Sequence, residues 1–289
     1  PASLRRAVSG GFMKQRVLTA IVLLLIFIPI LIFSGTPVFN VAAAVCCFLG
    51  VYEMLGCVGL RKHLFLTIPS LLYAAAGPLL ARTRFATAYG VLLSITVVYL
   101  MYLMFIHVFK VDKIRTADIG VVFMTTVYIT VSFTSIIRLR DVSSIGRYIY
   151  IFIFIGAWVT DIFAYFGGRI FGKHKLCPSV SPKKTIEGSI CGILFCSAAF
   201  VLYSMWVAHE LSDITPNYPI IALIGAFISA VSQLGDLTAS AIKRDYKIKD
   251  YGKIFPGHGG VMDRFDSIVA AAGFLYLTTA IPSLFRIFF

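Results

Sequence analysis

The chain alternates between long apolar runs and short polar segments. The runs that approach the about 20 residues needed for a helix to cross a bilayer fall at about 17–33, 38–56, 63–80, 86–109, 119–137, 148–172, 188–208, 218–242 and 267–285. The third run contains Pro69, Gly77 and Pro78, which membrane helices tolerate when neighbouring groups satisfy the freed backbone. This pattern predicts an all-α fold, a polytopic membrane bundle of about nine transmembrane helices.

The sequence shows no internal repeat, low-complexity tract or second soluble domain. We expect one integrated membrane domain with a basic tail at 1–16, N-terminal helices within 17–147, and catalytic helices and loops within 148–289. The basic residues before the first run could also belong to a cleaved signal peptide. Because the run is long and Ser34-Gly35-Thr36-Pro37 is a poor cleavage site, we expect a retained helix.

Composition supports the membrane interpretation. Hydrophobic residues make up 59% of the chain and charged residues 13%, against about 25% charged residues in average soluble proteins. The net charge of +13 is expected to fix topology and attract anionic lipid headgroups, so nucleic acid is not an expected partner. The six cysteines form neither a CxxC pair nor a Cys/His zinc pattern, which argues against structural disulfides or zinc.

The distribution of Lys and Arg predicts the orientation. With nine crossings, 20 of the 26 basic residues lie on the side of the N-terminus and 6 on the other. The positive-inside rule then places the N-terminus and the even loops in the cytoplasm. Without the last two loops on that side the counts are 9 and 6, so the preference is modest. We expect a multi-pass protein with its polar site on the cytoplasmic side.

Three acidic residues lie inside predicted spans, namely Glu53, Asp161 and Asp236. A carboxylate in hydrocarbon costs several kcal/mol on most scales, so each should face a cavity, a cation or a partner. The i, i+4, i+7 spacing of Asp161, Tyr165 and Gly168 places them on one helix face. These acids are therefore candidates for function.

Asp236, Ser240 and Lys243 repeat the same spacing in the eighth span. The alternative is that Asp161 and Asp236 each join helices through a basic neighbour. For Glu53, near the cytoplasmic end of its span, an ordinary role at the interface is an equal alternative.

Two basic segments follow the sixth span. Gly167–His174 matches GxxxxGK but has His where a P-loop needs Ser or Thr, and it follows a membrane helix rather than a strand, so we do not expect a Walker A site. Ser181–Gly188 contains Lys183 and Lys184 at the start of the seventh span. Two lysines beside a helix N-terminus suit phosphate groups, although they could also act only as a positive-inside signal.

Ser240–Asp266 concentrates charged and small residues. Gly257-His258-Gly259-Gly260 is a turn with little side-chain bulk, where the backbone can approach a ligand closely. Carboxylates such as Asp263 bind hard divalent cations, and basic side chains neutralise phosphate. The basic residues of the segment are Lys243, Arg244, Lys247, Lys249, Lys253 and Arg264. The combination suggests a metal ion with a polyphosphate, while His258 could either donate to a phosphate or only lock the turn.

These motifs resemble those of the CDP-diacylglycerol synthases, also called phosphatidate cytidylyltransferases. The family signature, approximately S-x-x-K-R-x4-K-D-x-G-x2-apolar-P-G-H-G-G-x-x-D-R-x-D, fits Ser240–Asp266 without a visible departure. A second family pattern, from Asp-x-x-Ala-Tyr to Ser-Pro-Lys-Lys-Thr-x-Glu-Gly, fits Asp161–Gly188. The two motifs cover about the C-terminal half, whereas the N-terminal helices match only in hydrophobic character.

The resemblance implies transfer of CMP from CTP to phosphatidate, with release of pyrophosphate, at the cytoplasmic face and with Mg²⁺ or another divalent cation. A second cation and a homodimer are compatible with it. As a hypothesis, Asp236 and Asp263 hold the magnesium and Asp161 shapes the site. The candidate catalytic residues are Asp236, Asp263, Lys243, Arg244, His258 and Arg264. The candidate substrate-binding residues are Asp161, Ser181, Lys183, Lys184, Ser240, Lys249, Asp250, Gly257, Gly259 and Gly260.

Three other functions fit parts of the pattern. A CTP-dependent polyprenol or phytol kinase would transfer the γ-phosphoryl group and release CDP. A secondary transporter would explain intramembrane carboxylates, but it predicts inverted repeats with broken helices, which the sequence lacks. A scaffold that binds anionic lipids through basic loops would bind without metal or turnover.

Overall fold

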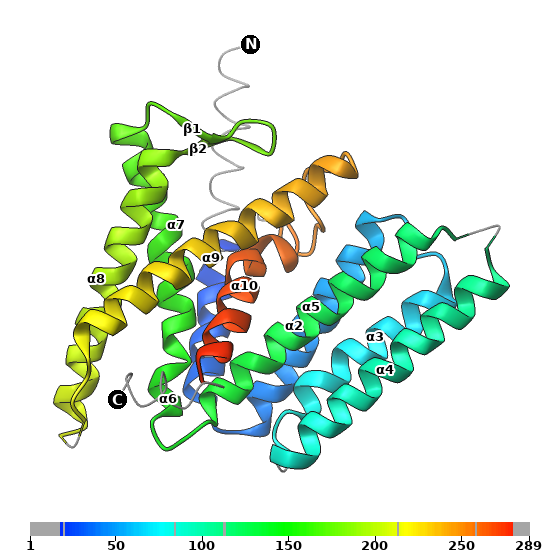
Figure 1. Cartoon of the computed structure of the whole chain (residues 1–289), viewed down its shortest axis with the longest axis horizontal. Helices are drawn as coiled ribbons and strands as arrows, with labels where there is room; N and C mark the ends of the chain where they lie inside the picture. Colours follow the sequence, from blue (N-terminus) through cyan, green and yellow to red (C-terminus); the bar gives the residue numbers. More distant parts are fainter. Residues whose placement is uncertain are drawn as a thin grey trace. The chain divides into compact units, whose positions relative to one another are not determined.

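The computed structural model describes residues 18–19, 21–83, 85–111, 114–212, 214–257 and 259–279 (Figure 1). An apolar helix, Ile21–Ile32, comes first. The other helices are α2 (Pro37–Cys57), α3 (Leu64–Leu80), α4 (Phe85–Phe109), α5 (Thr116–Arg140), α6 (Gly146–Ile149), α7 (Ile151–Phe171), α8 (Ile186–Glu210), α9 (Tyr218–Asp245) and α10 (Met262–Thr279). The described part of the chain is thus mainly helical, as predicted.

The chain forms two compact units. Among the described residues, the first contains those up to Thr130 together with Tyr246–Arg264, and the second contains Val131–Asp245 together with those from Phe265 to Thr279. The division falls within α5 and within α10, so the two units are described separately below.

Six helices of the described residues are long and apolar enough to cross a membrane. They are Pro37–Cys57, Gly90–Phe109, Thr116–Arg140, Gly146–Phe171, Ile186–Glu210 and Tyr218–Asp245. Two shorter apolar helices, Ile21–Ile32 and Leu64–Leu80, coincide with predicted spans. Large apolar side chains such as Leu93, Val98 and Met101 are exposed along α4, as expected where a helix faces lipid. The protein is therefore an integral membrane protein.

In the first unit, α2 and α3 pack against each other. The helix α3 continues through Pro69 and Pro78, as the sequence predicts. Pro69 has no N–H to bond the Phe65 carbonyl, and the Tyr102 hydroxyl donates to that carbonyl instead, at 2.8 Å. The buried Asn40 amide of α2 donates to the Pro78 carbonyl at 2.9 Å. These side chains satisfy backbone groups that a bilayer would leave without water.

In the second unit, α8 packs against both α7 and α9, and small residues permit the close contact. A Cβ added at Gly188 of α8 would lie 2.5 Å from the Ala164 carbonyl oxygen of α7 and 2.9 Å from the Gly168 Cα. Small residues at helix contacts are typical of membrane proteins, where close backbone approach replaces the hydrophobic effect as the source of association. A hydrogen bond of 2.8 Å from Thr160 to Ser229 also joins α7 to α9.

A short antiparallel hairpin, β1 (Lys175–Cys177) and β2 (Ser181–Thr185), connects α7 to α8. Figure 1 shows it at the ends of these two helices, and it contacts both. The all-α prediction missed it because this lysine-rich segment has no alternation of apolar and polar residues. Its pairing depends instead on a tertiary anchor.

That anchor is Glu187, in the first turn of α8. Its Oε2 accepts the backbone N–H of Lys173 at 3.1 Å, and its Oε1 pairs with His174 Nδ1 at 2.6 Å. The Thr185 hydroxyl caps the same helix by accepting the Gly188 N–H at 3.2 Å, which is a preferred arrangement at a helix N-terminus. The N-terminus of α8 thus holds both ends of the hairpin, the residues before β1 and the last residue of β2.

The charged segment Ser240–Asp266, which the predicted spans leave as a loop after residue 242, is a loop only in its middle. Its first six residues continue α9 to Asp245, and its last five open α10 from Met262. The loop predicted at 243–266 was therefore too long at both ends, because basic residues are favourable in the last turn of a helix and acidic residues in the first turn. Lys243 and Arg244 occupy the last turn of α9, and Asp263 occupies the first turn of α10.

The close contact of α7 and α8 gives a testable prediction. Gly188→Ala should lower the stability of the protein by about 1–3 kcal/mol, because the added methyl overlaps backbone atoms of α7. Thermal unfolding in detergent would measure the loss. Gly120→Ala in α5, where an added Cβ meets no atom within 4 Å, is the matched control and should be neutral or stabilising. Equal unfolding temperatures for the two variants would contradict the packing.

The hairpin anchor gives a second prediction. Glu187→Gln should speed amide hydrogen exchange at Lys173 and His174, because an amide group has one acceptor oxygen where the carboxylate has two. Mass spectrometry of peptides spanning 171–185 would detect this change. Glu210→Gln, at the exposed opposite end of α8, should leave exchange in these peptides unchanged. Unaltered exchange in the Glu187 variant would show that the hairpin does not depend on this carboxylate.

Candidate functional site

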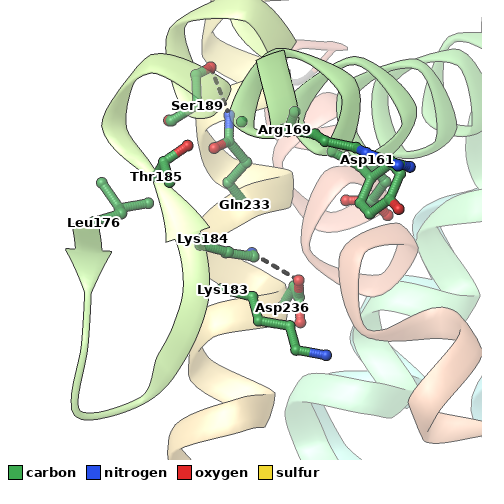
Figure 2. A pocket seen from close by; sticks show the side chains of 12 residues that line it. Asp161, Arg169, Leu176, Lys183, Lys184, Thr185, Ser189, Gln233 and Asp236 are labelled. Atoms are coloured by element: carbon green, nitrogen blue, oxygen red, sulfur yellow. Dashed lines mark hydrogen bonds and ion pairs between the residues drawn. The ribbon is translucent and has the colours of Figure 1, made fainter. Parts of the chain in front are cut away.

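The second unit contains a cavity of about 340 Å³. Figure 2 shows its walls, which come from α7, the hairpin, the start of α8 and α9. The polar and charged residues that line it are Asp161, Tyr165, Arg169, Lys183, Lys184, Thr185, Ser189, Gln233 and Asp236. The cavity therefore brings residues of the Asp161–Gly188 pattern together with Gln233 and Asp236 of α9.

The residues of α7 lie as predicted. Asp161, Tyr165 and Gly168 all line the cavity, which confirms that their spacing places them on one face. Ala164 and Arg169 line it as well. The helix thus presents an acid, a phenol, a cation and two small residues to the same space.

An ion pair crosses the cavity between β2 and α9. Lys184 Nζ lies 2.6 Å from Asp236 Oδ2, and about a quarter of each side chain is exposed. Ser240 donates to the other oxygen, Asp236 Oδ1, at 3.4 Å, which confirms the predicted shared face of α9. Figure 2 shows the Lys184 ammonium meeting Asp236, with the Lys183 side chain beside them. Lys184 is the basic neighbour that the alternative interpretation of Asp236 required, and it also places a cation beside the acid in a cavity.

A third acid, Asp266 of α10, belongs to the same region. The Ser267 hydroxyl donates to Asp161 Oδ2 at 3.4 Å, and the Ser267 N–H donates to Asp266 Oδ1 at 2.8 Å. The backbone of Asp266 lies against Gly235 of α9, where an added Cβ would be 2.8 Å from the Asp266 carbonyl oxygen. Asp266 precedes the apolar stretch of α10, and its burial raises the pKa of its carboxyl, as does the nearby Asp236.

The sequence prediction did not include Asp266 among the site residues. The available signal was its i, i+3 spacing from Asp263 in the Asp-Arg-Phe-Asp motif, which becomes informative once α10 is known to begin at Met262. Its position shows that three acids, from α7, α9 and α10, converge in the second unit.

The remaining predicted residues of this unit lie around the hairpin. Arg244 Nε donates to the Val180 carbonyl in the hairpin turn at 3.3 Å. Lys243 lies near enough to Asp266 to lower its pKa, against the larger effect of burial. Ser181 is half-buried in β2, and Lys183 is exposed. The last turn of α9, with Lys243 and Arg244, thus adds positive charge beside the lysines of the hairpin.

The glycine turn lies in the first unit. Gly257 and Gly259 have φ angles of 76° and 85°, a left-handed conformation that glycine adopts without steric cost. A backbone hydrogen bond of 2.9 Å from the Phe255 N–H to the Gly259 carbonyl closes the turn. The prediction for His258 lies outside the described residues. The structure therefore explains Gly257 and Gly259 of the motif by backbone conformation.

Asp263 organises the backbone around this turn. Its Oδ2 accepts the N–H groups of Tyr251 and Gly260, both at 2.9 Å. Its assignment as a metal ligand stays a prediction from the sequence. The predicted residues Lys249, Asp250 and Arg264 are exposed, consistent with side chains available to a ligand.

The sequence left the role of Glu53 open, and the structure makes it part of this unit's core. Its side chain is buried, and its two oxygens accept the backbone N–H groups of Val261 and Met262. A residue at the membrane interface would have an exposed carboxylate. The carboxylate of Glu53 is instead enclosed by a loop that lies near the C-terminal end of the sequence.

The donor chemistry of the second unit fits a magnesium nucleotide. Within the described ranges, no group of three or more His, Cys, Asp or Glu side chains could hold a metal ion. Mg²⁺ is usually bound through one or two carboxylates together with substrate phosphates. Asp236 and Asp266 supply carboxylates, and the neighbouring lysines suit phosphate oxygens.

Known proteins are similar in sequence to this chain over most of its length. The family model described as "Cytidylyltransferase family" matches residues 14–281. A phosphatidate cytidylyltransferase of Staphylococcus epidermidis is 36% identical over 259 residues, which cover 89% of this chain and 95% of the relative. One of Bacillus subtilis is 31% identical over 279 residues, or 94% of this chain and 99% of the relative. The chain therefore belongs to the cytidylyltransferase family.

Proposed function

We propose that this protein is a phosphatidate cytidylyltransferase, which transfers CMP from CTP to phosphatidate and yields CDP-diacylglycerol and pyrophosphate for phospholipid synthesis. The observation that carries the proposal is the match to relatives of this name over about nine tenths of the chain, at 31–36% identity. The chemistry of the cavity agrees with it, because lysines and carboxylates meet at its walls.

The reaction depends more on electrostatic stabilisation of the phosphate groups than on proton transfer. The phosphate monoester of phosphatidate has a second pKa of about 6, so it is largely a dianion near neutral pH and already nucleophilic. It must attack the α-phosphorus of CTP, which also carries negative charge, and pyrophosphate must leave. Cationic groups lower both barriers by neutralising the phosphate oxygens.

The cations of the second unit are placed for this task. Lys183 and Lys184 extend from β2 into the cavity, and Lys243 and Arg244 end α9 nearby. The ion pair of Lys184 with Asp236 holds one ammonium group at a defined position. We assign these four residues to the phosphates of the lipid and the nucleotide, with Ser181 and Ser240 as neighbouring hydroxyl groups.

Magnesium, when bound with CTP, would neutralise phosphate charge in the transition state. We propose that Asp236 is one of its ligands and that Asp161 shapes the cavity. Asp263 as a second ligand stays a prediction from the sequence, and Asp266 is a further carboxylate in the region of Asp236. A second cation is compatible with this number of acids.

The proposed topology follows from the sequence. Nine crossings, with the N-terminus and the polar site on the cytoplasmic side, agree with the distribution of Lys and Arg. The six long apolar helices and the two shorter ones support eight of these crossings. The proposed ninth crossing is α10, whose first five residues include Asp263, Arg264 and Asp266 ahead of its apolar stretch. Phosphatidate would enter sideways from the membrane with its acyl chains in lipid, and a homodimer is compatible with this arrangement.

The first test is product analysis with a site variant. Purified protein incubated with CTP, phosphatidate and Mg²⁺ should form CDP-diacylglycerol and pyrophosphate, and Asp236→Asn should lower kcat by about a hundredfold or more. Asp118→Asn, which alters an ion pair with the exposed Arg115 in the first unit, is the matched control and should stay within about twofold of wild type. Release of CDP instead of pyrophosphate would identify a lipid kinase. Wild-type turnover of the Asp236 variant would refute its assignment.

The second test is metal removal. Chelation by EDTA should abolish pyrophosphate release, and added Mg²⁺ should restore it, because the carboxylates alone add negative charge to a polyanionic substrate. Radiolabelled CTP turnover before and after chelation would measure this effect. Full turnover in excess EDTA would exclude a role for a divalent cation. Lipid binding that persists without turnover under both conditions would favour the scaffold function instead.

A further inference from the structure

Glu53 caps a helix that lies about 200 residues later in the sequence. It belongs to α2, and only 4% of its surface is exposed. Its Oε1 accepts the N–H of Val261 at 3.0 Å, and its Oε2 accepts the N–H of Met262 at 2.8 Å. The first N–H groups of a helix have no acceptor within the helix. Glu53 supplies two acceptors at the start of α10, and its negative charge also suits the positive end of the helix dipole.

The loop before α10 encloses this carboxylate. A Cβ added at Gly252 or at Gly260 would overlap the carboxylate atoms of Glu53. Neither glycine has a positive φ angle, so backbone conformation does not explain these two residues. The close approach of the loop to Glu53 explains them, because a side chain at either position would overlap its carboxylate. The glycines of the motif therefore serve two purposes, because Gly257 and Gly259 form the turn while Gly252 and Gly260 make room for Glu53.

Glu53 and Asp263 divide the backbone donors of the loop between them. Asp263 accepts the N–H groups of Tyr251 and Gly260, and Glu53 accepts the next two N–H groups along the chain, those of Val261 and Met262. Four backbone donors are thus held by two carboxylates, all within the first unit. The residue that follows the Glu53 contacts is Asp263 itself, so the position of this acid depends on both sets of bonds.

We propose that Glu53 is a positioning residue of the enzyme. It fixes the first turn of α10 and thereby sets the direction of Asp263 and the shape of the glycine turn. The expected effect of Glu53 on turnover rests on the proposed cytidylyltransferase function. Its expected effect on the backbone of the loop is independent of that function. Glu53 is too enclosed to touch a substrate, so it acts through the loop.

The experiment compares Glu53→Gln and Glu53→Ala with Asn40→Ala. Asn40 is the matched control because it is a buried polar residue of the same helix, and its side chain donates a 2.9 Å hydrogen bond to the Pro78 carbonyl of α3. Each purified full-length protein is measured for kcat and KM with CTP, for its unfolding temperature, and for amide exchange in peptides spanning 251–266.

We expect kcat per folded molecule to fall by about tenfold to a hundredfold in both Glu53 variants, since a hydrogen bond to a charged group is lost for each freed donor. Exchange should rise at Val261 and Met262. Glu53→Gln keeps the size of the side chain, so it should fold even where Glu53→Ala does not. Asn40→Ala should lower the unfolding temperature but keep kcat within about threefold, because the loop stays in place.

Two results would overturn the proposal. One is wild-type kcat with unchanged exchange in Glu53→Gln. The other is a loss of kcat that Asn40→Ala reproduces at the same unfolding temperature, since this would make the effect general destabilisation. Failure of the proposed function is distinguishable, because the wild-type protein would then form no CDP-diacylglycerol while exchange at 261–262 would still respond to the Glu53 variants.

Discussion

A carboxylate carried by an apolar helix must find a donor or a cation, because a bilayer offers it no water. Each acid within the described helices that the sequence singled out satisfies this constraint differently. Glu53 accepts two backbone N–H groups. Asp236 pairs with Lys184, and Asp161 accepts the Ser267 hydroxyl. These partners come from segments far away in the chain, so satisfying the acids also fixes how the helices and loops of each unit fit together.

The same constraint explains where the fold needs small residues and irregular backbone. Glu187 accepts the Lys173 N–H just before the hairpin, and Thr185 at the end of the hairpin accepts the Gly188 N–H of α8. Gly188 also lets α7 and α8 approach closely. In the first unit, the loop closes on Glu53 through Gly252 and Gly260. Non-helical backbone in a membrane protein is tolerated where it is enclosed by protein or lines a polar cavity, and both segments meet this condition.

These features suit a phosphoryl-transfer reaction between two anions. A cavity with lysines from one strand and acids from neighbouring helices can bind phosphate and a metal ion without a strong general base. Rigid support of such residues matters because small displacements of charge weaken transition-state stabilisation. The ion pair at Asp236 and the capped start of α10 provide this support in their respective units.

Periodicity and hydrophobicity in the sequence were enough to place the long helices, the shared face of Asp161, Tyr165 and Gly168, and the family motifs, because these depend on local spacing. They also identified Glu53 as a residue that needs a partner. The partner itself, the hairpin anchored by Glu187, the start of α10 at Met262 and the position of Asp266 depend on contacts between distant segments. Only the tertiary structure decided these, because a carboxylate's spacing in the chain shows that it must be satisfied but not which distant backbone or side chain will satisfy it.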